Sequence, residues 1–347
     1  MLWTIHSASA SLRHGELSPL ELVDTCLERI DRYEPHIHAW VFVDREYARN
    51  QAKEAATELR QGRWRGPLHG IPIGIKDIFD VYDWPTAAGS RLWAQSIARH
   101  DATVVRGLRQ AGAVLLGKTV TTQYASFDPP PTRNPWNLAR TPGGSSSGSA
   151  AAVACGMCLG ALASQTGGSI TRPASYCGVA GFKPTFRRVS TAGVVPLAPS
   201  MDHVGAIASS VRDLAMLLQT IAGSDAYDPE CSGQAVPDYL ARFQQASPAP
   251  RLGRLRGLFE DLAEPAMRKM MEQVADRLQS RGSVLSDVAL PSGFAEVLPS
   301  HRTVMAVEAA AYHASRLRRH PDDYAPKIRS LLEEGLACPA PEYARCK

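Results

Sequence analysis

The chain has 347 residues, enough for one large α/β domain or for two to three smaller ones. Hydrophobic residues make up 44% and charged residues 21% of the chain, which excludes a disordered protein and is typical of a soluble globular one. The net charge is only +4, and the densest basic cluster, residues 316–320, is short enough to be a solvated helix face. The charge therefore indicates neither nucleic acid nor a membrane surface as a partner.

No segment indicates export or insertion into a membrane. No run approaches the ~18 consecutive apolar residues of a transmembrane helix. The start of the chain, Met1-Leu2-Trp3-Thr4, lacks the basic and then apolar regions of a secretory signal. The seven cysteines are an odd number and are scattered, which fits a reducing compartment better than a disulfide scaffold. The sequence predicts a soluble, cytoplasmic protein.

The first predicted helix begins at Ser18. Ser18-Pro19-Leu20-Glu21 is a capping box with proline in the first turn, and apolar residues then recur at helical spacing as far as Ile30, before Pro35. Further elements are predicted in chain order: helix 45–61, strand 71–75, helix 103–111, strand 113–116, a helix-prone run 150–154, a helix from Ser210 to about Ile221, and helix–strand alternation at 254–259, 264–281 and 284–289. A polar stretch, 224–251, precedes the last group. This alternation is typical of an α/β sheet.

Two short patterns match known motifs without the structural context that those motifs need. Residues 112–119 match the P-loop pattern, but residues 113–116 are strand-forming where a phosphate cradle needs a flexible loop. Residues 144–148 match the G-x-S-x-G elbow with Ser146 at its centre, but the polar approach over 137–142 contains a proline where the elbow needs a strand. We therefore predict neither a nucleotide-binding loop nor an α/β-hydrolase.

A lysine in apolar surroundings is the first candidate catalytic residue. Lys76 follows the run 71–75 and precedes Ile78, so we expect its ammonium group to be largely buried. Burial lowers the pKa of a lysine, and a neutral amine can accept a proton as a general base. The alternative interpretation is a structural ion pair of Lys76 with Asp77 or Asp80.

Two loops of small residues supply candidate nucleophiles. Residues 166–169, Thr-Gly-Gly-Ser, combine a hydroxyl with several unhindered N–H groups, and acyl transfer needs both. Residues 143–149 add four serines just before a helix N-terminus, where N–H groups favour negative charge. Either loop alone is more often a turn or a helix cap. Together with Lys76, and without a histidine partner, they predict a serine hydrolase that uses lysine as its base.

Three blocks of the sequence resemble the amidase signature family: residues 70–77, 142–150 and 166–169. Supporting stretches are 172–178, 181–185 and 200–205. The resemblance implies an α/β fold with a mixed β-sheet core flanked by helices, in a single domain over 1–347 whose signature core lies at about 65–220. Family members usually run well past this C-terminus, so we expect the C-terminal part of the domain to be incomplete and to leave an exposed apolar face.

The resemblance also implies a Ser-cisSer-Lys triad. Ser169 would be the nucleophile, Ser145 the bridging serine after a cis peptide bond, and Lys76 the general base. Backbone N–H groups of the second loop would form the oxyanion hole: Thr166, Gly167 and Gly168. The implied partner is a small-molecule amide, cleaved through an acyl-enzyme without a metal or an organic cofactor. One departure from the family pattern is Gln165, where many members carry aspartate.

Two alternative functions remain open at this stage. A glutamyl-tRNA amidotransferase A-type subunit shares the triad but works with other subunits and charged tRNA, and residues 121–137 favour a stand-alone amidase over it. The other alternative is a truncated, inactive member of the family. The sequence identifies neither the amide nor the oligomeric state, and a homodimer is compatible with it.

The remaining conspicuous residues receive structural interpretations. Cys155 and Cys158 share an alanine-rich helix without a second cysteine pair, which favours packing over metal binding. Cys177 lies in a core-like run. His203 follows Asp202 and is expected to form a structural hydrogen bond, because a serine activated by lysine needs no histidine. We predict no metal site.

Overall fold

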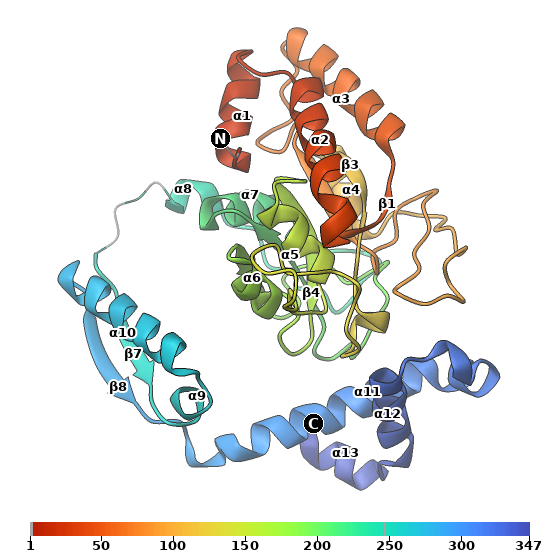
Figure 1. Cartoon of the computed structure of the whole chain (residues 1–347), viewed down its shortest axis with the longest axis vertical. Helices are drawn as coiled ribbons and strands as arrows, with labels where there is room; N and C mark the ends of the chain where they lie inside the picture. Colours follow the sequence, from red (N-terminus) through yellow and green to blue (C-terminus); the bar gives the residue numbers. More distant parts are fainter. Residues whose placement is uncertain (1–2, 244, 246–247) are drawn as a thin grey trace.

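A six-stranded mixed sheet lies at the centre of the computed structural model, which describes residues 3–243, 245 and 248–347 (Figure 1). The strand order is β1-β3-β2-β4-β6-β5. β2 pairs in parallel with β3 and β4, and the other pairs are antiparallel. The strands are β1 (Trp40–Val43), β2 (Pro72–Lys76), β3 (Val114–Thr119), β4 (Gly160–Gln165), β5 (Ala180–Phe182) and β6 (His203–Ala208). The predicted α/β class with a mixed sheet is confirmed.

Helices surround this sheet, and most of the predicted ones form within one to three residues of the expected bounds. They are α1 (Ile5–His14), α2 (Pro19–Ile37), α3 (Arg45–Arg60), α4 (Thr103–Gln110), the short η1 (Gln123–Ala125), α5 (Ser147–Ala154), α6 (Thr171–Cys177), α7 (Val211–Ile221) and α8 (Tyr239–Phe243). The predicted capping box forms. The Ser18 side chain accepts from the backbone N–H group of Glu21, and the Glu21 carboxylate accepts from the backbone N–H group of Ser18.

Helix α2 differs from the expectation in its end. It continues through Pro35 to Ile37 instead of stopping before the proline. In the last turn a proline removes only one helix hydrogen bond, so its cost there is small. The carboxylate of Glu34 also accepts from the backbone N–H groups of Ala39 and Trp40, at 2.9 and 3.0 Å, which fixes the passage from α2 into β1.

Strand β3 contains the residues that match the P-loop pattern. The strand predicted at 113–116 forms and extends through Gly117 and Lys118 to Thr119. The ammonium of Lys118 is fully buried and lies 2.9 Å from a carboxylate oxygen of Asp77. These residues therefore belong to the core of the sheet rather than to a loop around a phosphate.

Helix α5 places the first small-residue loop against the sheet. It packs on β2, β3, β4 and β6 and consists only of Ser, Gly, Ala and Val, so it can approach the strands closely. A Cβ atom at Gly148 would overlap the backbone of Ala39 and Val120. The loop before α5 is thereby held over the ends of β2 and β4.

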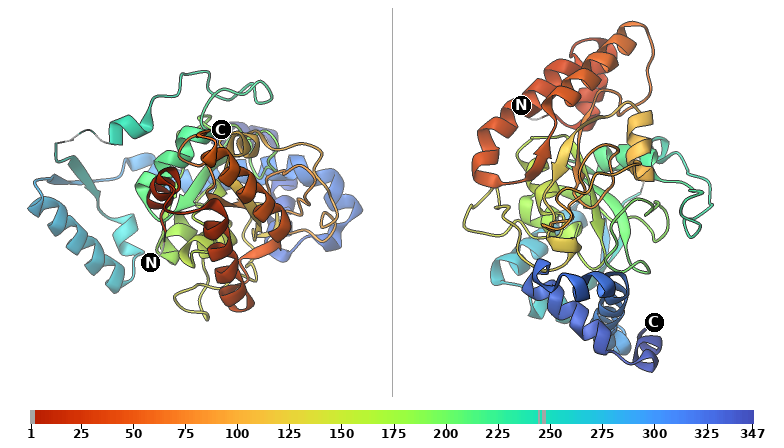
Figure 2. Two further views of the ribbon diagram at one scale, coloured as in Figure 1. Left: turned by 90° about the horizontal axis from the view of Figure 1, so that it is seen from above. Right: turned by 90° about the vertical axis from the view of Figure 1, so that its right-hand side faces the viewer.

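A second, separate sheet follows the main one. β7 (Arg251–Leu255) and β8 (Val284–Val288) pair in parallel and are joined by α9 (Leu258–Asp261) and α10 (Pro265–Ser280). Figures 1 and 2 show this unit projecting beside the main sheet. The predicted alternation is confirmed, although residues 254–259 hold the end of a strand and the start of a helix. Apolar side chains of this unit are exposed: Leu255, Met267, Met270, Met271, Val274, Val284 and Val288.

The part of the chain from Ser292 onwards is helical and returns to the main body. It comprises η2 (Ser292–Glu296), α11 (Val297–Arg319), η3 (Pro321–Asp323), α12 (Pro326–Ala337) and α13 (Ala340–Cys346). Figure 1 shows α11 and α12 lying along one edge of the main body. Residues 244, 246 and 247 of the polar stretch 224–251, and residues 1–2 at the start of the chain, lie outside the described residues.

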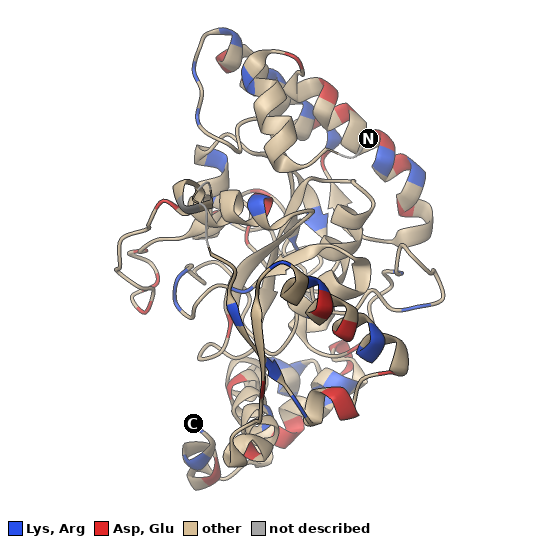
Figure 3. Cartoon of the chain, turned by 90° about the vertical axis from the view of Figure 1, so that its left-hand side faces the viewer, with Lys and Arg blue, Asp and Glu red and all other residues tan. Residues whose placement is uncertain are grey.

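Charged residues are distributed over the exterior. On the side drawn in Figure 3, basic and acidic residues alternate along the outer helices. Within the described part of the chain, no helix is long and apolar enough to cross a membrane.

Candidate active site

Lys76 ends strand β2 with its side chain completely buried. Its amine nitrogen donates to the hydroxyl oxygens of Ser145 and Ser164, each at 2.8 Å. The alternative ion pair with Asp77 does not form, because Asp77 pairs with Lys118 instead. Among the described residues, Lys76 thus donates to two hydroxyl groups and forms no ion pair with a carboxylate.

The environment of Lys76 favours its neutral form. Burial lowers the pKa of Lys76 from 10.5 to about 7, and the negative charge of Asp202 partly opposes this shift. Near neutral pH a large fraction of the amine is therefore unprotonated and can accept a proton.

The first small-residue loop gives each of its buried serines a different partner. The peptide bond between Gly144 and Ser145 is cis, as the resemblance implied. The Ser146 hydroxyl donates to the carbonyl oxygen of Ser164 at 3.3 Å, and the Ser147 hydroxyl donates to that of Gly143 at 2.8 Å. Ser146, the centre of the G-x-S-x-G match, is fully buried and tied to β4, so it lacks the exposure of a nucleophile elbow.

The second loop, residues 166–169, follows strand β4. The backbone N–H group of Ser146 donates to the carbonyl oxygen of Ser169 at 3.2 Å, which joins the two loops. Within the described residues, the N–H groups of Gly167, Gly168 and Ser169 donate no hydrogen bond and are free to receive an anion. The described residues likewise show no hydrogen bond between the hydroxyls of Ser145 and Ser169. The lysine–serine contact is present, and the serine–serine contact is not formed in this conformation.

Gln165 holds the second loop at its base, a role that the sequence did not reveal. Its side-chain oxygen accepts from the N–H groups of Ile170 and Thr171, at 2.8 and 2.9 Å, and from the Thr171 hydroxyl. Gln165 therefore closes the turn in which Ser169 lies. The departure from the family pattern at this position was the only sequence signal that could have drawn attention to it.

Asp202 and Ser164 are also part of the site and were not predicted. Asp202 accepts from the Thr166 hydroxyl at 2.5 Å through one carboxylate oxygen, and from the N–H groups of Leu197 and Ala198 through the other. Burial raises the pKa of Asp202, and these three donors oppose that shift. Asp202 belongs to the block 200–205 that carried part of the family resemblance, which was the available signal.

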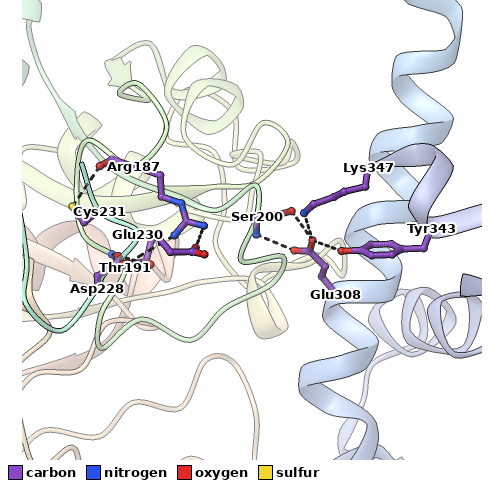
Figure 4. A network of polar contacts seen from close by, with 9 residues as sticks. All are labelled: Arg187, Thr191, Ser200, Asp228, Glu230, Cys231, Glu308, Tyr343 and Lys347. Carbon is purple, nitrogen blue, oxygen red and sulfur yellow. Dashed lines mark hydrogen bonds and ion pairs between the residues drawn. The ribbon is translucent and has the colours of Figure 1, made fainter. Parts of the chain in front are cut away.

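Helix α11 anchors the loop that carries Asp202 (Figure 4). The carboxylate of Glu308 accepts from the backbone N–H group of Ser200 at 2.9 Å and from its hydroxyl at 2.5 Å. Tyr343 and Lys347 donate to the same carboxylate, at 3.0 and 2.8 Å. The C-terminal helices therefore support a loop of the site, although they lie outside the predicted signature core.

The other residues singled out from the sequence have structural surroundings. His203 contacts the carbonyl oxygen of Met201 through Nδ1 at 2.7 Å, in line with the predicted structural hydrogen bond. Cys155, Cys158 and Cys177 are buried, and burial raises the pKa of the Cys177 thiol to about 12 and that of Cys155 to about 11. These thiols are therefore protonated and inert at neutral pH.

A small cavity lies against the site. Its volume is about 240 Å³, and Ser164, Thr166 and Asp202 lie in its wall. The cavity therefore borders Ser164, which accepts a hydrogen bond from Lys76, and Thr166, the first residue of the second loop.

Comparison with known proteins identifies the family. The family model described as Amidase matches residues 21–339. The chain belongs to the amidase family. The match includes Lys76, both small-residue loops and Asp202, so the whole site lies within the part that this family shares.

Individual relatives of this amidase-family chain agree with the assignment. The putative amidase AmiD of Mycobacterium bovis is 40% identical over 342 residues, covering 96% of this chain and 70% of AmiD. The A-type subunit of the glutamyl-tRNA(Gln) amidotransferase of Prochlorococcus marinus is 41% identical over 307 residues, 86% of this chain and 63% of that relative. Among solved structures, the peptide amidase from Stenotrophomonas maltophilia is 34% identical with a TM-score of 0.88, over 99% of this chain and 77% of that one.

Proposed function

We propose that this amidase-family chain hydrolyses a small linear carboxylic amide through a serine acyl-enzyme, with Lys76, Ser145 and Ser169 as a Ser-cisSer-Lys triad. The observation that carries the proposal is the 2.8 Å contact between the buried amine of Lys76 and the hydroxyl of Ser145. A buried, largely neutral amine beside a hydroxyl is the arrangement that general-base activation of a serine needs.

The first half of the reaction forms the acyl-enzyme. Neutral Lys76 takes a proton from Ser145 as Ser145 takes one from Ser169, and the Ser169 oxygen bonds to the amide carbon. The free N–H groups of the turn 166–169 stabilise the negative charge that develops on the carbonyl oxygen. The proton returns through Ser145 to the amide nitrogen, the carbon–nitrogen bond breaks, and ammonia or an amine leaves.

The second half releases the acid. Water gives a proton to the same relay and its oxygen bonds to the acyl carbon. The bond to the Ser169 oxygen then breaks, and Ser169 regains its proton. Ser169 supplies the proton that leaves with the amine, and water supplies the one that Ser169 regains, so the chemistry needs no metal or organic cofactor.

Substitution of the proposed nucleophile tests this function. Purified Ser169→Ala is expected to lose hydrolysis of every amide in a panel of aliphatic, aromatic and peptide amides, while its circular dichroism and melting temperature match the wild type. Ser146→Ala is the matched control, because Ser146 is a buried serine of the neighbouring loop outside the relay. Hydrolysis that survives in Ser169→Ala but is lost in Ser146→Ala would contradict the assignment.

The amidotransferase alternative rests on the 41% identity to an A-type subunit. Co-purification with a partner subunit that is required for amide hydrolysis would favour this alternative. Hydrolysis by the purified chain alone would favour a stand-alone amidase, which we expect to be cytoplasmic and to form one domain over 1–347.

A further inference from the structure

The carbonyl oxygens of the turn 166–169 all accept a hydrogen bond. The donors, in order along the turn, are Nε2 of His301 at 3.4 Å, the side-chain nitrogen of Gln165 at 3.5 Å, and the backbone N–H groups of Arg172 at 2.9 Å and Ser146 at 3.2 Å. Among the described residues, the N–H groups of residues 167–169 donate no hydrogen bond. The protein therefore holds this turn by its carbonyl groups and leaves these N–H groups to a ligand.

A hydrogen bond to a carbonyl oxygen also fixes the direction of an N–H group. The C=O group of Thr166 and the N–H group of Gly167 belong to one planar trans peptide unit and point in opposite directions. A donor on the Thr166 oxygen therefore sets where the Gly167 N–H group points. The donors on the next two carbonyl groups set the N–H groups of Gly168 and Ser169 in the same way.

His301 brings helix α11 into this arrangement. It precedes Glu308 by seven residues, which is about two turns, so both side chains lie on one face of α11. Glu308 accepts from the N–H group and the hydroxyl of Ser200, which anchors this face to the loop before β6. The anchored helix can therefore hold the imidazole ring of His301 against the turn, 135 residues away in the sequence.

The glycine at position 167 gives the ring room. A Cβ atom at Gly167 would lie 3.2 Å from Cε1 and 3.7 Å from Nε2 of His301, and the first of these distances is tighter than ordinary van der Waals contact. The half-buried imidazole thus lies directly beside the peptide unit of Thr166 and Gly167. Because a carbonyl oxygen can only accept, Nε2 carries the proton of this contact.

We propose that His301 is a positioning residue of the oxyanion hole, which donates to the carbonyl oxygen of Thr166 and so aims the N–H group of Gly167 at the oxygen of the attacked amide. The inference rests on the proposed function, because it takes Ser169 as the nucleophile and this turn as the oxyanion hole. An N–H group aimed at the developing oxyanion stabilises the transition state more than the bound amide. Loss of the aim should therefore lower kcat and leave KM nearly unchanged.

Two substitutions separate the hydrogen bond of His301 from the packing of its ring. His301→Phe keeps a planar ring beside Gly167 and removes the donor, whereas His301→Gln keeps a side-chain N–H group and removes the ring. Because the hydrogen bond is long, we expect His301→Phe to lower kcat by about tenfold, less than the ~10²–10³ that the loss of a whole oxyanion donor costs. His301→Gln is expected to keep kcat within about threefold of the wild type, measured on the amide of the panel that the wild type hydrolyses best.

His320→Phe is the matched control. His320 follows the last residue of α11 and is exposed, so its substitution is expected to leave kcat unchanged. The rate at which a fluorophosphonate labels Ser169 is a second measurement, because the phosphoryl oxygen of the probe enters the same oxyanion hole. Labelling is expected to slow about tenfold in His301→Phe and to stay close to the wild-type rate in His301→Gln and His320→Phe.

The outcomes distinguish this inference from the proposed function. A His301→Phe variant with the wild-type kcat and labelling rate, or a His301→Gln variant as slow as His301→Phe, would overturn the inference and leave the proposed function standing. If His301→Phe does not fold, His301→Leu removes the donor with a smaller side chain, and the same loss is expected of it. A wild type in which neither hydrolysis nor labelling depends on Ser169 would contradict the proposed function itself.

Discussion

Ser164 accepts a hydrogen bond from Lys76 at 2.8 Å, the same distance that separates Lys76 from Ser145. The amine is therefore held by two hydroxyl groups, one from the loop before α5 and one from β4. Only Ser145 belongs to the proposed relay, so we assign Ser164 the role of orienting the amine toward Ser145.

Removal of the Ser164 hydroxyl should weaken this orientation. Ser164→Ala is expected to lower kcat by about tenfold and to destabilise the fold by roughly 1–2 kcal/mol, because a buried amine loses one of its partners. Steady-state kinetics and urea unfolding measure the two effects. A kcat equal to that of the wild type would show that Ser145 alone orients the amine.

The activity should depend on pH through Lys76. Because the neutral amine is the base and burial lowers its pKa to about 7, kcat/KM is expected to rise with pH and to level off above about pH 8. Lys76→Arg should be nearly inactive at every pH, since arginine keeps its proton. A Lys76→Arg variant with most of the wild-type activity would exclude the lysine as the base.

The same pKa predicts how stability changes with pH. The folded state releases the Lys76 proton at about pH 7, whereas the unfolded chain keeps it until about pH 10.5. Between these values the unfolded state binds more protons, so the free energy of unfolding rises with pH through this window. Lys76→Met should be inactive but more stable than the wild type, most of all below pH 7. Equal stability of the two proteins at pH 6 would contradict the buried, costly charge.

Glu308 offers a test of the C-terminal support. Burial alone would raise its pKa, but hydrogen bonds from Lys347 and Ser200 lower it below the ordinary value. Its contribution to stability is therefore present above the ordinary glutamate pKa and is lost as pH falls through the lowered one. Glu308→Gln is expected to cost about 1–2 kcal/mol at pH 7 and less at an acidic pH below the lowered pKa, as urea unfolding at the two pH values can show. A cost that is equal at both pH values would assign the effect to packing.

The sequence predicted the proposed catalytic residues better than the distant residues that hold them in place. The apolar residues around Lys76 indicated its burial, and the glycines of 166–169 indicated a turn with free N–H groups, because both features are local. Asp202 and Thr166 meet across 36 residues, and Glu308 and Ser200 across 108, so no local pattern could pair them. Helix–strand alternation was expected at 254–259, 264–281 and 284–289, but the pairing of β7 with β8 in a sheet of their own depends on tertiary packing.

The measurement that tests the central claim most directly is the site at which a serine-reactive probe becomes attached. The wild type is incubated with a fluorophosphonate, and the modified peptide is located by mass spectrometry, in parallel with Lys76→Met and Ser169→Ala. The account predicts one adduct on Ser169, formed much more slowly in Lys76→Met and not at all in Ser169→Ala. An adduct on Ser145 or Ser146, or a rate in Lys76→Met equal to that of the wild type, would contradict it.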